Sequence, residues 1–283
     1  MVEHAYAKLN LSLDVLGKAA NGYHDLRTVM QSVSFGDDVE IELTDGEWSI
    51  DPGRPYLPAD EKNLALQAAM LFLAGTGRGA RIRVEKRTPV CAGLGGGSAD
   101  AAAVLRALNR MTGAGKTADE LRAMALELGS DVPFCVQGGT ALAEGRGERL
   151  TVLPSMPDCP ILICKPDFSI ATPELFAKID ARKSRLRSDT AGIADALERG
   201  DLAGIARRMY NGFEDVLSRA QSEVDALKNE LLTLGALGAV MTGTGSAVFG
   251  VFGDETAAGK AYEALASRCK DCLPTRPSPK IAV

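Results

Sequence analysis

The sequence is most distinctive at Pro89-Val90-Cys91-Ala92-Gly93-Leu94-Gly95-Gly96-Gly97-Ser98-Ala99-Asp100, where four of five consecutive residues are glycine. Because glycine has no side chain, the backbone N–H groups of such a run can approach an anion closely. Residues 99–111 are predicted to form a helix, whose unsatisfied N-terminal N–H groups favour phosphate. The run therefore indicates a site for ATP phosphates, and a tight structural turn is the alternative.

Two better-known phosphate loops do not match this run. A dinucleotide fingerprint requires G-x-G-x-x-G, and Ser98 occupies the place of the third glycine. A Walker A loop requires G-x-x-x-x-G-K-[ST], and Gly115-Lys116-Thr117 supplies only its end, because Arg110 stands where the first glycine belongs. We interpret residues 115–117 as a turn between two helices.

The segments around the glycine run predict an α+β fold. Apolar residues alternate over residues 5–16 and 29–43, which is typical of strands, with an interruption at Gly36-Asp37-Asp38. Thr117 and Glu120 form a capping box at the start of a helix over residues 117–128. The other expected elements are helices over 63–74 and 99–111, strands over 80–86 and 161–164, a strand-rich segment over 134–153, two or three helices between 173 and 234, then strand, loop, strand and a helix over 255–269.

These elements suggest two domains. Strands and helices do not alternate regularly, which favours the α+β class over a parallel α/β sheet. Residues 154–160 contain three prolines, a pattern typical of a boundary. We therefore expect an N-terminal domain over residues 1–153 and a C-terminal domain over residues 160–283.

The charge of the chain excludes some classes of partner. With a net charge of -5 and a pI of about 5.3, the chain lacks the basic surface required for bulk binding to nucleic acid or an anionic membrane. Residues 231–253 carry no charge and are long enough to cross a membrane. Their six glycines and the polar residues 242–246 instead predict two buried strands joined by a loop.

The cysteines and the N-terminus predict a cytoplasmic protein. The first residues lack the pattern of a secretory signal, and the six cysteines follow no regular framework, so we expect reduced thiols. No metal ligand is assigned, because two histidines and a single C-x-x-C, Cys269 to Cys272, do not predict a zinc site. The sequence does not distinguish a monomer from a homodimer.

Three further groups of polar residues interrupt apolar segments. Lys8 and Asn10 are two positions apart on the first predicted strand and therefore point to one face, where a lysine holds a phosphate or simply faces solvent. Asp131 follows a predicted helix and is either a general base or a partner for local backbone groups. Residues 242–246 form a second glycine-rich loop, which serves a second phosphorylated partner or closes over the first loop.

In their order, these blocks resemble the GHMP kinase superfamily, and more closely the family of 4-diphosphocytidyl-2-C-methyl-D-erythritol kinases. The Gly22-Tyr23-His24 turn after the first strand is the most discriminating block. The other matching blocks are residues 5–11, 89–100, 128–133, 143–145 and 242–246. The resemblance implies an N-terminal domain like the second domain of ribosomal protein S5, a ferredoxin-like C-terminal domain and an active site between them.

The resemblance also implies an activity, namely ATP-dependent phosphorylation of the 2-hydroxyl of 4-diphosphocytidyl-2-C-methyl-D-erythritol, in the methylerythritol phosphate route to isoprenoid precursors. Asp131 would be the catalytic base and Lys8 would hold it ionised. The implied ATP-binding residues are Pro89, Val90, Cys91, Ala92, Gly93, Leu94, Gly95, Gly96, Gly97, Ser98 and Ala99. The implied substrate-binding residues are Asn10, Tyr23, His24, Phe176, Thr242, Gly243, Thr244 and Gly245.

Mg²⁺ is expected with ATP, although the sequence assigns no ligand to it. One departure from the family is Ala99, which stands where a second serine usually follows the glycines. Two alternatives remain open. The chain is another GHMP kinase, acting on homoserine or mevalonate, or it is a nucleotide-binding protein without catalysis, which has no need of both Lys8 and Asp131.

Overall fold

Two long antiparallel strands, β1 (Val2–Lys18) and β2 (His24–Thr44), form the centre of the larger of two sheets. The computed structural model describes residues 1–18, 22, 24–182, 186–218 and 222–283. Both predicted strands are confirmed, but the predicted interruption at Gly36-Asp37-Asp38 is wrong. The strand β2 continues through it because a Cβ on Gly36 would lie 2.1 Å from the Ala5 carbonyl oxygen, so glycine permits the close pairing. The irregularity is a shift of register next to this point.

The larger sheet has the strand order β3-β4-β2-β1-β8, and β5 and β6 extend it beside the other half of β2. Because β2 is so long, β4 pairs with its second half and β5 with its first half. The remaining strands of this sheet are β3 (Trp48–Asp51), β4 (Gly79–Glu85), β5 (Thr140–Gly145), β6 (Arg149–Val152) and β8 (Tyr210–Asn211).

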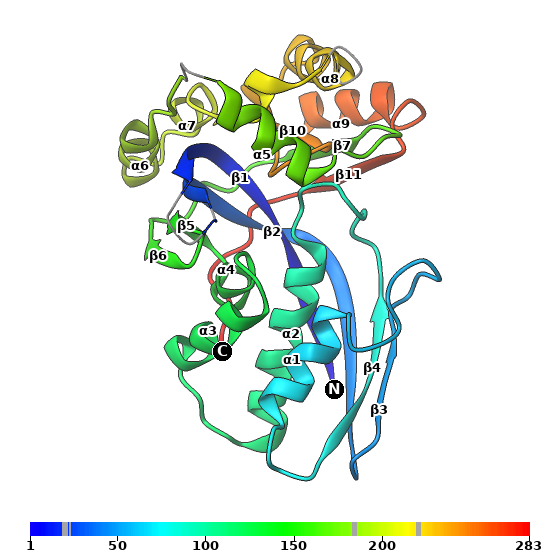
Figure 1. Ribbon diagram of the computed structural model, residues 1–283. Helices are drawn as coiled ribbons and strands as arrows, with labels where there is room; N and C mark the ends of the chain where they lie inside the picture. Colours follow the sequence, from blue (N-terminus) through cyan, green and yellow to red (C-terminus); the bar gives the residue numbers. More distant parts are fainter. Residues whose placement is uncertain (19–21, 23, 183–185, 219–221) are drawn as a thin grey trace.

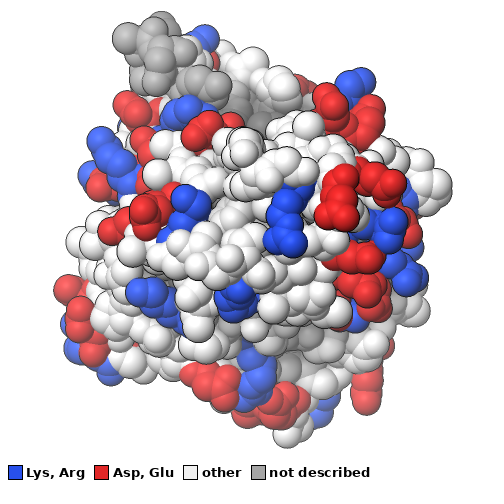
Figure 2. Space-filling model, turned by 90° about the horizontal axis from the view of Figure 1, so that it is seen from below, with Lys and Arg blue, Asp and Glu red and all other residues white. Residues whose placement is uncertain are grey.

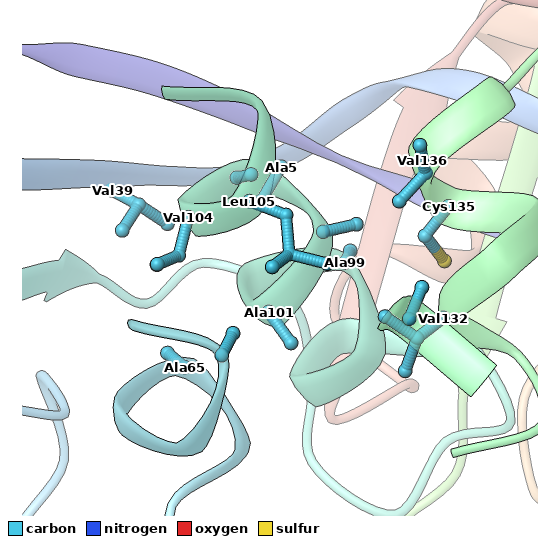
Figure 3. Close-up of a cluster of buried hydrophobic side chains, with 14 of the residues drawn as sticks. Ala5, Val39, Ala65, Ala99, Ala101, Val104, Leu105, Val132, Cys135 and Val136 are labelled. Carbon is cyan, nitrogen blue, oxygen red and sulfur yellow. The ribbon is translucent and has the colours of Figure 1, made fainter. Parts of the chain in front are cut away.

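The helix α2 (Gly96–Thr112) lies against β1 and β2, beside α1 (Leu64–Phe72) (Figure 1). Figure 3 shows why it lies so close. The small side chains of Ala99 and Ala101 point into a cluster with Ala5 and Ala65, so little separates the backbones. Burial of this alanine-rich helix fixes the direction in which its N-terminus points.

Two shorter helices follow α2. The helix α3 (Ala118–Leu128) begins at the predicted capping box. The helix α4 (Val132–Gln137) was not predicted, since residues 134–153 were expected to be rich in strands. All six residues of α4 are buried, so the segment has no amphipathic periodicity to distinguish it from a strand.

The smaller sheet has the order β11-β7-β10-β9 and is antiparallel throughout. The strands β9 and β10 confirm the strand, loop and strand predicted within residues 231–253. None of the described helices is long and apolar enough to span a membrane. The strand β11 was not predicted, because Pro274 within it is unfavourable for a strand. The strands are β7 (Ile161–Lys165), β9 (Gly238–Met241), β10 (Val248–Val251) and β11 (Asp271–Thr275).

Helices pack around this smaller sheet, and α8 and α9 contact its strands. Four α-helices are described between residues 173 and 234, more than the two or three predicted, because α7 has only five residues. The α+β class is confirmed. The helices are α5 (Thr172–Ala181), α6 (Thr190–Glu198), α7 (Leu202–Ala206), α8 (Ser222–Thr233) and α9 (Glu255–Leu265), with a 3₁₀ helix η1 (Glu214–Val216).

Residues 276–283 leave β11 and return to the larger sheet, where they end near α4 (Figure 1). The N–H of Ser278 donates to the Ser32 carbonyl at 2.8 Å, and the N–H of Ile281 donates to the Gln137 carbonyl at 2.9 Å. The buried amide of Gln31 donates to the Ser278 carbonyl at 3.0 Å. We call residues 276–283 the C-terminal strap. The domain boundary at residues 154–160 stays a prediction.

The surface at the lower end of the molecule carries charges of both signs. Figure 2 shows basic and acidic side chains interspersed on this face rather than gathered by sign. Exposed ion pairs also occur on the larger sheet, where Arg81 on β4 pairs with Glu42 on β2 at 2.7 Å.

Removal of residues 277–283 is expected to lower the free energy of unfolding by about 2–4 kcal/mol, because three hydrogen bonds to the larger sheet are lost at ~0.5–1.5 kcal/mol each. Urea denaturation measures the change. Removal of residues 282–283 alone, which are exposed, is the control and should change it by less than about 0.5 kcal/mol. Equal stability of the two truncated chains would contradict a stabilising role for the strap.

Candidate active site

Two cavities meet at the glycine run. The loop cavity, of about 640 Å³, lies over the run itself, and the hairpin cavity, of about 670 Å³, extends from the run towards the turn between β1 and β2. Both are lined by Gly93, Gly95, Ser98, Thr172 and Thr244. A ligand in one cavity therefore reaches a ligand in the other across the start of α2.

The start of α2 faces both cavities. Gly95 adopts a left-handed conformation (φ 68°) as the N-cap, and the helix begins at Gly96, three residues before the predicted start. The first N–H groups of a helix have no partner within the helix, so they are available to an anion here. All ten residues from Pro89 to Ser98 line the loop cavity.

Ala99 lies behind the residues of the glycine run that line the loop cavity. Its side chain is buried in the core (Figure 3), and its N–H donates to the Gly95 carbonyl within the helix at 2.8 Å. A serine in place of Ala99 would therefore have its Cβ on the core side of the helix. The family's second serine, which Ala99 replaces, is at a position that does not line either cavity.

The second glycine-rich loop packs directly on the first. A Cβ on Gly93 would lie 2.0 Å from the Thr242 carbonyl oxygen, and a Cβ on Gly243 would lie 3.0 Å from the Gly93 carbonyl oxygen. Gly93 has a φ of 78°, which also favours glycine. The Thr242 hydroxyl donates to the Gly93 carbonyl at 3.2 Å. These contacts join the loop between β9 and β10 to the glycine run.

Asn10 connects both loops to the predicted catalytic lysine. Its Oδ1 accepts from Lys8 Nζ at 2.8 Å and from the N–H of Gly243 at 2.9 Å. Its Nδ2 donates to the Thr28 hydroxyl at 2.8 Å. The side chains of Lys8 and Asn10 are both buried, and the pattern that placed them on one face of a strand is confirmed. Asn10 thus orients Lys8 as well as lining the hairpin cavity.

The structure brings Lys8 and Asp131 together across 123 positions of sequence. Lys8 Nζ lies 3.6 Å from Asp131 Oδ2, an ion pair that is longer than a direct hydrogen bond. Asp131 is the N-cap residue of α4, but its carboxylate makes no capping hydrogen bond with that helix. The carboxylate is 35% exposed, lines the hairpin cavity and is therefore accessible to a ligand there.

A second lysine supports the start of the glycine run. Lys86 Nζ is buried between Asp37 Oδ2 at 2.7 Å and Asp100 Oδ2 at 2.5 Å. Asp37 Oδ1 also accepts the N–H groups of Arg87 and Thr88, both at 2.7 Å. Asp37 thus holds the segment that leads into the glycine run, which explains a charged residue in the middle of a buried strand.

These buried charges perturb one another. Burial raises the pKa of Asp100 to about 7, although the Lys86 ammonium opposes the shift. Burial disfavours the charge of Lys86, but the carboxylates of Asp100 and Asp37 outweigh it and raise the pKa of Lys86. Within the described residues, Asp100 Oδ1 has no hydrogen-bond partner. One lysine therefore pairs with two buried carboxylates.

Aromatic residues line the far end of the hairpin cavity. His24 stacks on Phe176 with ring centroids 4.3 Å apart, and Phe176 meets Phe213 edge to face at 5.0 Å. His24 Nε2 donates to Asp180 Oδ1 at 2.9 Å, so this carboxylate fixes the ring. Two predicted substrate residues, His24 and Phe176, are thus in contact. The predicted Tyr23 lies outside the described residues.

Several lining or supporting residues were not predicted. Asn211 on β8 donates to the Met241 and Gly243 carbonyls, each at 2.8 Å, and so holds the second loop. Arg146 and Asp180 line the hairpin cavity. Only Arg146 has a sequence signal, since it is a charged residue between two glycines. Among the residues that the structure describes, no group of three or more His, Cys, Asp or Glu side chains is placed to hold a metal ion.

Comparisons with known proteins identify the family. Residues 63–139 match the family model for the GHMP kinases N terminal domain, and residues 193–271 match that for the GHMP kinases C terminal region. A 4-diphosphocytidyl-2-C-methyl-D-erythritol kinase of Clostridium botulinum is 38% identical over 278 residues, which cover 98% of this chain and 99% of the relative. One of Clostridium beijerinckii is 38% identical over 274 residues, 96% of this chain and 98% of the relative.

The chain belongs to the 4-diphosphocytidyl-2-C-methyl-D-erythritol kinase family.

Solved structures agree with this assignment. A crystal structure of 4-(cytidine 5'-diphospho)-2C-methyl-D-erythritol kinase matches with a TM-score of 0.84 and 34% identity, over 98% of this chain and 99% of the other. A homoserine kinase from Cytophaga hutchinsonii matches with a TM-score of 0.76 over 99% of this chain and 94% of the other, but at 20% identity it shares the fold alone. The predicted two-domain GHMP kinase fold is confirmed.

Gly93→Ala is expected to separate the two glycine loops, because the new Cβ would overlap the Thr242 carbonyl. We expect a loss of stability of at least about 2 kcal/mol, measured by thermal unfolding, and ATP affinity reduced more than about tenfold, measured by calorimetry. Gly97→Ala is the matched control for stability, since its Cβ would meet only the Leu64 side chain at 3.8 Å. Equal melting temperatures for the two variants would contradict the close contact.

Asp100→Asn is expected to gain stability relative to the wild type as the pH rises. Since the folded pKa of Asp100 is raised to about 7, the folded state holds a proton that the unfolded state releases near pH 4, and wild-type stability falls between these values. The fall has an upper bound of about 4 kcal/mol. Urea denaturation at pH 5 and pH 8 measures the difference. Asp45→Asn, at an exposed position, controls for the lost charge. A difference that is the same at both pH values would contradict the shift.

Proposed function

We propose that this chain transfers the γ-phosphoryl group of ATP to the 2-hydroxyl of 4-diphosphocytidyl-2-C-methyl-D-erythritol, a step in isoprenoid precursor biosynthesis. The observation that carries the proposal is the meeting of two cavities at the start of α2, with Lys8 and Asp131 beside the junction. The names and similarity of the relatives select this acceptor among the alcohols that GHMP kinases phosphorylate.

ATP binds in the loop cavity in this proposal. The N–H groups of residues 96–98 and the positive end of the α2 dipole favour its phosphates. The nucleoside lies at the other end, where Leu57, Pro58 and Leu64 supply apolar surface. This orientation directs the γ-phosphate towards the wall that the two cavities share.

The acceptor binds in the hairpin cavity. The cytosine lies at the aromatic end, with His24 and Phe176, and the sugar alcohol lies at the end with Asp131 and Lys8. The His24 and Phe176 rings are now 4.3 Å apart, a normal stacking distance, so a base that enters between them must separate them. Of the predicted substrate residues in the second loop, Gly243 and Thr244 line this cavity, Gly245 lines the loop cavity, and the buried Thr242 lines neither.

The reaction requires mainly positioning and charge stabilisation, because phosphoryl transfer passes through a loose transition state. Asp131 accepts the proton of the 2-hydroxyl as its oxygen attacks the γ-phosphorus, and ADP leaves. Lys8 lies beside the Asp131 carboxylate and stabilises negative charge on the phosphoryl oxygens as they move. Asn10 holds the Lys8 ammonium at the junction throughout.

Mg²⁺ fits this site as a partner of the ATP phosphates. Magnesium bound to nucleotides keeps several waters and takes one or two protein oxygens. Ser98 lines both cavities at their junction, and we propose that its hydroxyl would hold the ion. When bound, the ion would neutralise charge on the phosphates. The cytoplasmic location and the choice between monomer and homodimer stay predictions.

Asp131→Asn is expected to lower kcat by about 10²–10⁴-fold, since it removes the base but keeps the shape of the side chain. ATP affinity should change less than about threefold, because the carboxylate lines the hairpin cavity rather than the loop cavity. ADP release with 4-diphosphocytidyl-2-C-methyl-D-erythritol gives kcat, and calorimetry gives the ATP affinity. Lys8→Met should lower kcat similarly.

The control for this experiment is Asp119→Asn, an exposed carboxylate on α3 that pairs with Arg122. It should keep wild-type kcat. Turnover of Asp131→Asn within about threefold of the wild type would remove Asp131 from the mechanism. A panel with homoserine and mevalonate tests the acceptor, and phosphorylation of either one in place of the cytidyl substrate would overturn the proposed function.

A further inference from the structure

The turn between β5 and β6 has a fixed conformation that presents Arg146. Gly145 and Gly147, on either side, have φ values of 72° and 113°, which disfavour other residues. The N–H of Arg146 donates to Glu148 Oε2 at 2.6 Å, and a Cβ on Gly145 would lie 2.7 Å from Glu148 Oε1. The Glu148 carboxylate thus fills the inside of the turn, and the backbone of Arg146 is held in place.

This turn bridges the two ends of the hairpin cavity. Gly145 pairs with Leu26 on β2, which is two residues from His24 at the aromatic end. A Cβ on Gly147 would lie 3.3 Å from the carbonyl oxygen of Ser130, the neighbour of Asp131 at the reacting end. Arg146 lies between these two anchors, is half-buried and lines the cavity.

The charge of the cavity differs in sign from that of the chain. Among the residues that the structure describes, the charged ones that line it are three cations, Lys8, Lys18 and Arg146, and two carboxylates, Asp131 and Asp180. The chain as a whole has a net charge of -5. A cavity with an excess of cations in an acidic protein favours an anionic ligand.

We propose that the Arg146 guanidinium binds the diphosphate of the acceptor, an inference that rests on the proposed function. In that substrate the diphosphate connects the cytidine to the sugar alcohol. If the base lies at His24 and the alcohol at Asp131, the diphosphate lies between them, and the turn that carries Arg146 contacts both ends through Gly145 and Gly147. A guanidinium offers planar paired donors that match phosphate oxygens.

The γ-phosphate of ATP is the competing anion for Arg146. The lining argues against it, because Arg146 lines the hairpin cavity and not the loop cavity, whereas Gly93, Gly95 and Ser98 line both. Arg146 therefore distinguishes acceptors that carry a diphosphate from simple alcohols and contributes little to ATP binding.

Steady-state kinetics of Arg146→Ala test this assignment. The KM for the cytidyl substrate should rise about 10–100-fold, as expected for loss of a charged hydrogen bond, while kcat and the KM for ATP change less than about threefold. Arg146→Lys keeps the charge and should recover part of the loss. Arg149→Ala is the matched control, since Arg149 is exposed on β6 three residues away and does not line the cavity.

Calorimetry with CDP and with cytidine, each in the presence of a non-hydrolysable ATP analogue, separates binding of the diphosphate from a general distortion of the turn. The wild type should bind CDP more tightly than cytidine, and Arg146→Ala should lose most of that preference while cytidine affinity is unchanged. Equal weakening of both ligands would overturn the inference, because it indicates a structural effect. So would a raised KM for ATP alone.

The outcome for the wild type distinguishes the two proposals. If the wild type turns over the cytidyl substrate but Arg146→Ala has an unchanged KM, the role of Arg146 fails and the proposed function stands. If the wild type binds no CDP and phosphorylates no cytidyl substrate, the proposed function fails and the role of Arg146 fails with it.

Discussion

The close packing of Gly93 on Thr242 is the constraint on which the site depends. A side chain on Gly93 would overlap the Thr242 carbonyl, so the loop between β9 and β10 rests directly on the glycine run. That contact brings the N–H of Gly243 to the carboxamide of Asn10, whose oxygen also accepts from Lys8. The position of the Lys8 ammonium is therefore set jointly by β1, the glycine run and the smaller sheet. A displacement of either loop would move the lysine relative to Asp131.

The two lysines near the glycine run have different environments and different consequences. Lys86 is enclosed by two carboxylates and is committed to supporting the run, since Asp37 also binds the backbone of Arg87 and Thr88. Lys8 lies 3.6 Å from one carboxylate that is partly exposed, so a ligand can insert beside the pair. The two short ion pairs of Lys86 give it a structural role. The longer ion pair of Lys8 leaves its ammonium accessible to a ligand, as catalysis requires.

The sequence predicted the parts of this site that depend on local pattern. Two polar residues spaced two apart put Lys8 and Asn10 on one face, and the glycine run before a helix indicated the anion site. Proximity of Lys8 to Asp131 was implied only by resemblance, because no local pattern reports contacts across 123 positions. Asp37 was misread as a break, since its partners come from the segment after β4. No local pattern marks Asp180, whose place in the site follows only from the cavity that it lines, whereas Arg146 stands out in the sequence as a charged residue between two glycines. The helix α4 is too short and too buried to show a period.

The C-terminal strap has a consequence for how the chain acquires its structure. The carbonyl of Ser32 and the amide of Gln31 bond to each other and also to Ser278, about 246 residues later in the chain. During synthesis the N-terminal strands emerge first, so these hydrogen bonds to Ser278 cannot form until residues 276–283 have been made. Completion of the first sheet is therefore coupled to completion of the smaller one. Contacts of such long sequence separation are closed slowly, so the final docking of the strap is a natural late step in folding.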